Sequence, residues 1–301
     1  MTDWAAIATR FGLYLDLMLL FGLAAYPLYA IRAAPLANQR AIIFGLSIAG
    51  LVLSIASFGV MAAAMAGVAV TGLDGETLRV LLLETAPGSA FIARNVALVA
   101  AAAFALGRSP LPLAWLIALC AGIALASLAW TGHAAVTEGV PGTLHRVADI
   151  VHLLAAAAWI GALVALFKAL ASALDDEDAL AAARRALSGF AWAGSLLVAL
   201  VIATGVVNGG MILGWQGLGL LPATLYGQLL IAKLTLFAAM LGLAAANRWR
   251  LAPRLDAARD AGDIAVAARI VRTSIAVEAA AATLILGLVA WLGTLDPTGG
   301  I

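Results

Sequence analysis

The stretch HRVADIVHLLAAAAWIGALVALFKAL, residues 145–170, decides the fold because it is apolar for most of its length. As an α-helix, a run of this length crosses the hydrocarbon core of a bilayer, which is about 30 Å thick. The bilayer core offers no water to unpaired backbone groups, so such a run can only be helical. The stretch therefore predicts a transmembrane helix.

The composition extends this prediction to the whole chain. Of 301 residues, 64% are hydrophobic and 11% are charged, and the mean hydropathy is +1.07. A soluble domain carries about 25% charged residues, so the chain is an integral membrane protein. We expect an all-α, polytopic transmembrane bundle that forms a single domain over residues 1–301. Eight segments are long and apolar enough to span: 10–31, 41–70, 90–107, 111–131, 145–170, 190–213, 224–246 and 272–294.

The distribution of lysine and arginine predicts the orientation. Twelve of these residues lie in or beside the joins after the first, third, fifth and seventh segments, four lie on the opposite side, and Lys233 lies within a segment. Lysine and arginine concentrate on the cytoplasmic side, so both termini and the joins 71–89, 132–144 and 214–223 are predicted to face the periplasm. Membrane lipid surrounds the spans, and the net charge of +1 gives no reason to expect a nucleic-acid partner.

All three histidines lie close together on the predicted outward side, at His133, His145 and His152. His145, Asp149 and His152 are spaced i, i+4, i+7 and share one stripe of the fifth span, for which Thr143 is the expected N-cap. Seven residues rise about 10.5 Å, whereas metal–nitrogen bonds are near 2 Å, so the two histidines of this span are not expected to hold one ion together. Each should take partners from other helices, with His133 the natural partner of either and Asp149 orienting a ring.

Two further features lie at a similar predicted depth. Asp16 lies about two turns inside the first span, and Met61 and Met65 are spaced i, i+4 near the outward end of the second span. Carboxylate, thioether and imidazole together suit copper, since methionine prefers Cu(I) and histidine accepts Cu(I) or Cu(II). Structural roles stay open for each group, as hydrogen-bonding partners or as packing residues.

Three polar residues lie deeper in the predicted spans, namely Asn208, Lys233 and Glu278. Charged groups at membrane depth face the bundle interior and find partners there. Lys233 is predicted near the middle of its span and Glu278 nearer the cytoplasmic end, so a direct pair requires offset helices. These residues either gate a pathway or lock the bundle.

Several strings resemble the CopD copper-resistance membrane proteins, and the resemblance runs over almost the whole chain. It implies an inner-membrane protein that handles copper, often beside a small periplasmic copper carrier of the CopC type. The segment 84–94, ETAPGSAFIAR, resembles that family's outward loop entering the third span. The other strings are TGHA (131–134), DIVHLLAAAAWIGAL (149–163), ATGVVNGG (203–210), TLYGQLLIAKLTLF (224–237) and NRWRLAPRL (247–255).

The resemblance also carries over to particular residues. His133 and His152, the latter preceded by Asp149, correspond to the family's recurring histidines, whereas His145 matches no typical position. The family's lysine and acid in the last two spans match Lys233 and Glu278. The resemblance leaves the direction of transport open.

The leading hypothesis is a copper permease or channel with an outward-facing histidine site. The sequence shows no ATPase motif, so transport would be passive or driven by an ion gradient, and outward ligands slightly favour uptake. A b-type haem protein with His133 and His152 as axial ligands is the first alternative. A non-transporting, copper-binding partner of a periplasmic carrier is the second. No nucleophile–base pair, phosphate-binding loop or HExxH motif is present, so we expect no enzyme.

Overall fold

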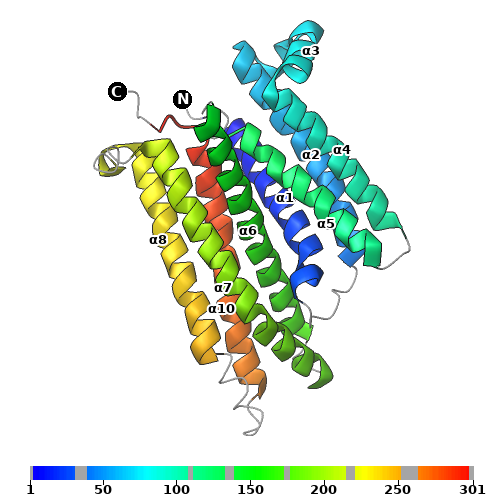
Figure 1. Cartoon of the computed structure of the whole chain (residues 1–301), viewed down its shortest axis with the longest axis vertical. Coiled ribbons are helices and arrows are strands. Elements are labelled where there is room, and N and C mark those ends of the chain that lie inside the picture. The colour runs from blue at the N-terminus through cyan, green and yellow to red at the C-terminus, as the bar shows by residue number, and fades with distance from the viewer. Residues whose placement is uncertain are drawn as a thin grey trace.

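The structure, a computed structural model, describes residues 3–30, 39–107, 111–132, 139–172, 177–214, 221–251 and 264–297. All regular secondary structure in these ranges is helical, which confirms the all-α fold class (Figure 1). The helices are α1 (Trp4–Tyr29), α2 (Gln39–Ala66), η1 (Val70–Gly72), α3 (Gly75–Glu84), α4 (Ala86–Leu106), α5 (Leu111–Ala126), η2 (Ser127–Trp130), α6 (Gly139–Ser172), α7 (Glu177–Leu213), α8 (Leu225–Ala246), the π-helix η5 (Asn247–Leu251) and α10 (Ile264–Leu292).

Each of the eight expected spans coincides with a helix. Seven are long and apolar enough to cross a membrane, and the eighth, α5 continued by η2, is a shorter apolar helix. The helices that begin furthest before the expected bounds are α7, at Glu177 rather than at residue 190, and α10, at Ile264 rather than at residue 272. Their added turns are rich in alanine, the strongest helix former, so the helix continues where the apolar run has ended.

The start of α6 differs from the sequence-based expectation. The helix begins at Gly139, and the Thr143 hydroxyl donates a hydrogen bond of 3.2 Å to the Gly139 carbonyl inside the first turn. Thr143 is therefore not the N-cap of this helix. Pro141 lies in the same turn, where a missing backbone N–H costs no intrahelical hydrogen bond.

The second span ends earlier than its apolar run. Gly67 has a φ of +68°, and its N–H bonds the Ala64 carbonyl while the N–H of Val68 bonds the Ala63 carbonyl at 3.1 Å. This pair of bonds is the Schellman motif that ends many helices at a glycine. The expected unbroken helix over 41–70 therefore stops at Ala66, and the join after it contains the short helix α3.

The helices form two groups that meet along α1 and α6 (Figure 1). On one side α1 packs with α2 and α5, and α4 joins these two; on the other side α6 packs with α7 and α10, and α8 packs against α10. The start of α1 and the end of α10 lie at the same end of the bundle, which also holds α3 (Figure 1). We call this the outward end, following the orientation that the lysine and arginine distribution predicts.

The backbones of α1 and α6 touch where two glycines face each other. A Cβ added to Gly22 would collide with the Ala157 carbonyl oxygen, and one added to Gly161 would collide with the backbone of Gly22. Below this contact, the Tyr29 hydroxyl donates a hydrogen bond of 2.7 Å to the Ala158 carbonyl. Lipid tails are as apolar as the helices, so close packing of small residues, rather than hydrophobic burial, holds such helices together.

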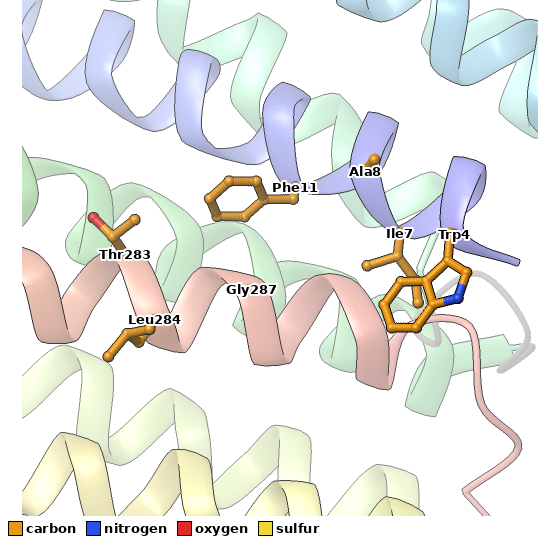
Figure 2. A pocket seen from close by; sticks show the side chains of 7 residues that line it. All are labelled: Trp4, Ile7, Ala8, Phe11, Thr283, Leu284 and Gly287. Carbon is orange, nitrogen blue, oxygen red and sulfur yellow. The ribbon is translucent and has the colours of Figure 1, made fainter. Parts of the chain in front are cut away.

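A shallow apolar groove of about 270 Å³ runs along the outward half of α1 and α10. Trp4, Ile7, Ala8 and Phe11 line it from α1, and Thr283, Leu284 and Gly287 from α10 (Figure 2). None of these side chains is titratable, and Trp4 and Leu284 are mostly exposed. The groove therefore offers a surface for apolar contact but no chemistry of a polar site.

We expect Gly22→Ala and Gly161→Ala to lower the free energy of unfolding by about 1–3 kcal/mol each, the usual cost of overpacking. Gly45→Ala is the matched control, because nothing lies within 4 Å of a Cβ at Gly45 and alanine favours a helix. Unfolding by SDS in mixed micelles measures the difference. Equal stability of all three variants would contradict the backbone contact between α1 and α6.

Candidate functional site

Five polar side chains gather between α6, α7 and α8, and we call them the α6–α8 polar cluster: Asp149, His152, Thr204, Asn208 and Lys233. Lys233 follows the start of α8 by eight residues, which places it about 12 Å below the outward end of that helix. Asn208 precedes the end of α7 by five residues. The cluster therefore lies in the outward half of the bundle.

Asp149 is at the centre of this cluster. The Asn208 side-chain amide donates a hydrogen bond of 3.3 Å to Asp149 Oδ1. The carboxylate and the Lys233 ammonium carry opposite charges that act on each other. Because a lone buried charge is costly, each of these two groups offsets the other while no ion is bound. Asn208 Oδ1 is buried and accepts no hydrogen bond within the described part of the chain.

His152 points toward α7. Its Nδ1 lies 2.9 Å from the Thr204 hydroxyl oxygen, and that hydroxyl is 2.6 Å from the Leu200 carbonyl, to which it donates its proton. The Thr204 oxygen can then accept a hydrogen bond from Nδ1–H, which leaves the Nε2 lone pair of a neutral His152 free as a ligand. Thr204, rather than the expected Asp149, thus orients this ring.

The other two histidines are separate from this cluster. His145 lies two turns nearer the outward end of α6 and is buried, with 1% of its surface exposed. The seven-residue spacing on a continuous helix keeps it about 10.5 Å along the axis from His152, so the two do not share one ion. His133 lies outside the described residues, and its pairing with either histidine stays a prediction.

The cluster offers fewer ligand atoms than a tightly binding metal centre needs. In the residues that the structure describes, no group of three or more His, Cys, Asp or Glu side chains could hold a metal ion. The cluster supplies one imidazole, one carboxylate and one amide oxygen. These donors suit a cation that passes through better than one that is permanently bound, since conduction requires binding weak enough for release.

The two methionines differ in their surroundings. Met61 lines a cavity of about 310 Å³ at the outward end, whereas Met65 is 55% exposed. The charged groups that line this cavity include Arg10 and Arg94, which disfavour a cation beside Met61. We call this space the outward cavity; it is lined by Asp3, Ala6, Thr9, Arg10, Leu13, Tyr14, Ser57, Phe58, Val60, Met61, Ala64, Arg94, Leu128, Thr131 and Thr294.

Asp16 and Glu278 occupy two further places. Asp16 follows the start of α1 by twelve residues, so it lies more than three helical turns from that end rather than the expected two. Its Oδ2 is next to Gly50 of α2 and is buried, with no hydrogen-bond partner among the described residues. Glu278 is buried in α10 and accepts a hydrogen bond from Asn247, at the inward end of α8. Lys233 and Glu278 therefore have different partners.

Comparisons with known proteins agree with this architecture. A family model described as "Copper resistance protein D-like, N-terminal domain" matches residues 1–143, and one described as "Copper resistance protein D" matches residues 184–292. The protein named "Copper resistance protein D" from Pseudomonas syringae pv. tomato is 42% identical over 306 residues, which cover 99% of this chain and 98% of that protein. The chain belongs to the copper resistance protein D family. The resemblance found in the sequence is thus confirmed, while the expected single domain stays a prediction.

A second relative supports the location of this copper resistance protein D family member. "Inner membrane protein YebZ" from Escherichia coli strain K12 is 31% identical over 300 residues, which cover 97% of this chain and 98% of that protein. Together with the candidate spans, these relatives make the protein a multi-pass protein of the inner membrane with a copper-related function. No solved structure matches the chain.

The opposite charges of Asp149 and Lys233 give a stability prediction. We expect Asp149→Asn and Lys233→Met each to cost about 3–5 kcal/mol, because each leaves an uncompensated charge at membrane depth. The double variant should lose much less than the sum, since both charges are then gone. SDS unfolding of the four proteins measures this coupling.

The control cycle combines Asp149→Asn with Thr235→Val. Thr235 is exposed on the same helix as Lys233, and its hydroxyl bonds the Ile231 carbonyl at 2.9 Å. These two changes should be additive. Additivity in the Lys233 cycle as well would rule out the electrostatic coupling.

Proposed function

We propose that the protein moves copper ions across the inner membrane and that the α6–α8 polar cluster is a station on their route. Family membership supports copper as the cargo. The observation that carries the proposal is that one polar cluster combines the His152 imidazole, the Asp149 carboxylate and the unpartnered Asn208 Oδ1. An orphaned acceptor beside a carboxylate is a place for a cation.

Lys233 has a defined role in this proposal. Its ammonium offsets the charge of Asp149 while no copper is present, so the empty site carries no net charge. An arriving copper ion competes with this ammonium for the carboxylate. This competition weakens the binding of copper, and weak binding favours passage of the ion over its retention at the site.

Several features of the proposal come from the sequence. Transport would be passive or driven by an ion gradient, and the outward position of the cluster slightly favours uptake. We further propose that copper arrives from a separate periplasmic carrier of the CopC type, and that the protein catalyses no reaction. A haem bound between His133 and His152 stays an alternative, but His133 is outside the described residues.

We expect His152→Ala to reduce copper flux into proteoliposomes at least tenfold, because it removes the only imidazole of the cluster. His152→Gln should behave in the same way: it can still hydrogen-bond Thr204, so it separates the loss of a ligand from the loss of a contact between α6 and α7. Thr235→Val should leave the flux unchanged. Separate assays with Cu(II) and with reductant-stabilised Cu(I) identify the preferred oxidation state.

Two results would contradict the permease. Equal flux through wild type and both His152 variants would remove the cluster from the route. Copper binding without any flux in wild type would favour a non-transporting partner of a carrier.

A further inference from the structure

The outward cavity contains a buried cation that the copper proposal does not use. Arg94 of α4 lines this cavity with only 3% of its surface exposed. Its Nε donates a hydrogen bond of 3.0 Å to the neutral Ser54 hydroxyl. Among the described residues, no carboxylate lies within ion-pair distance of Arg94. Burying a guanidinium without a counter-charge costs free energy. An anion bound in the cavity would therefore stabilise Arg94.

A second guanidinium lines the same cavity. Arg10 of α1 donates hydrogen bonds to two backbone carbonyls, those of Gly293 and, at 2.8 Å, Thr131. Both acceptors are neutral, so they orient the guanidinium without cancelling its charge. Asp3 is the carboxylate that lines the cavity, and it is exposed and already accepts hydrogen bonds of 3.1 Å from the Ala5 and Ala6 amides.

Tyr14 adds a phenol hydroxyl to the two guanidinium groups of this cavity. This residue is 9% exposed and lines the cavity, and the charges of both Arg10 and Arg94 act on its hydroxyl. The charge of Asp149, on α6, also acts on Tyr14, but this carboxylate already accepts a hydrogen bond from Asn208 and is offset by the charge of Lys233. Two guanidinium groups and one phenol therefore line a cavity whose one carboxylate among the described residues, that of Asp3, is already engaged by backbone amides.

The walls of the cavity indicate the kind of anion. The forked guanidinium group matches the two oxygens of a carboxylate. Leu13, Phe58 and Met61 add apolar walls beside these donors, which suits a ligand with a short hydrocarbon part. A volume of about 310 Å³ is at the small end of ligand pockets. With two arginines against Asp3, the lining carries one net positive charge, which a single carboxylate balances.

We propose that the outward cavity binds a short-chain organic acid, whose carboxylate is held by Arg10, Tyr14 and Arg94. The carboxylate lies between α1 and α4, and the hydrocarbon part lies against Leu13 and the α2 side chains. The ligand thereby bridges α1 to the α2–α4 pair at the outward end. This site does not depend on copper transport, and its test contains no copper.

Sodium butyrate is the probe, added to the purified full-length protein in detergent at constant ionic strength with sodium chloride as the balancing salt. A ligand that binds the folded state raises the midpoint of thermal unfolding in a saturable way. We expect such a rise with butyrate and none when chloride replaces it. Arg94→Gln should weaken the apparent affinity at least tenfold, and Tyr14→Phe at least threefold.

Arg79→Gln is the matched control, because Arg79 is an outward arginine that pairs with Glu76 at 3.1 Å on the exposed helix α3, away from the cavity. It should respond to butyrate as wild type does. Equal midpoints in butyrate and chloride would overturn the proposal, as would an unchanged affinity in Arg94→Gln. Should Arg94→Gln fail to fold, Tyr14→Phe decides: a weakened response supports the site, and a wild-type response overturns it.

Discussion

The contact between Gly22 and Gly161 is the constraint on which the rest of the structure depends. It lets the backbones of α1 and α6 touch, and the two groups of helices meet along this line. Because lipid provides no hydrophobic force between helices, the pair holds together through close packing and the bond from Tyr29 to the Ala158 carbonyl. With α6 fixed against α1, it also packs against α7 and α10.

The packing of α6 explains why the polar groups are found together. Asp149 and His152 are on α6 only three residues apart, yet their partners come from Asn208 and Lys233 in one case and from Thr204 in the other. Asn208 Oδ1 is the buried atom of the cluster that has no partner among the described residues. A short, partly satisfied set of donors in the outward half of the bundle fits an ion in transit, and the offset charge of Asp149 keeps the empty site stable.

The outward end combines two electrostatic environments. The α6–α8 polar cluster has a carboxylate at its centre, while the outward cavity has the guanidinium groups of Arg10 and Arg94. The two sites thus differ in the charge at their centre, and the charges of Arg10, Arg94 and Asp149 all act on Tyr14 of α1. Met61, which the sequence grouped with the histidines as a copper ligand, lies on the cationic side, and so a thioether there contacts an environment suited to an anion.

The sequence by itself determined the all-α membrane bundle, its eight spans and its family, because hydrophobic length and backbone hydrogen bonding leave no other structure in a bilayer. It also identified Asp149, His152, Asn208 and Lys233 as candidates, since polar groups in apolar spans are conspicuous. Only the tertiary structure decided which of them interact: the charges of Lys233 and Asp149 act on each other, while Glu278 accepts a hydrogen bond from Asn247. Thr204 and Arg94 lie within strings that resemble the family, but the sequence did not mark them as site residues, because a hydroxyl in a span and an arginine near a helix start are common. Which residues of different helices become partners depends on how the helices pack and on how each helix is rotated about its axis. The spacing of residues along the chain does not encode either.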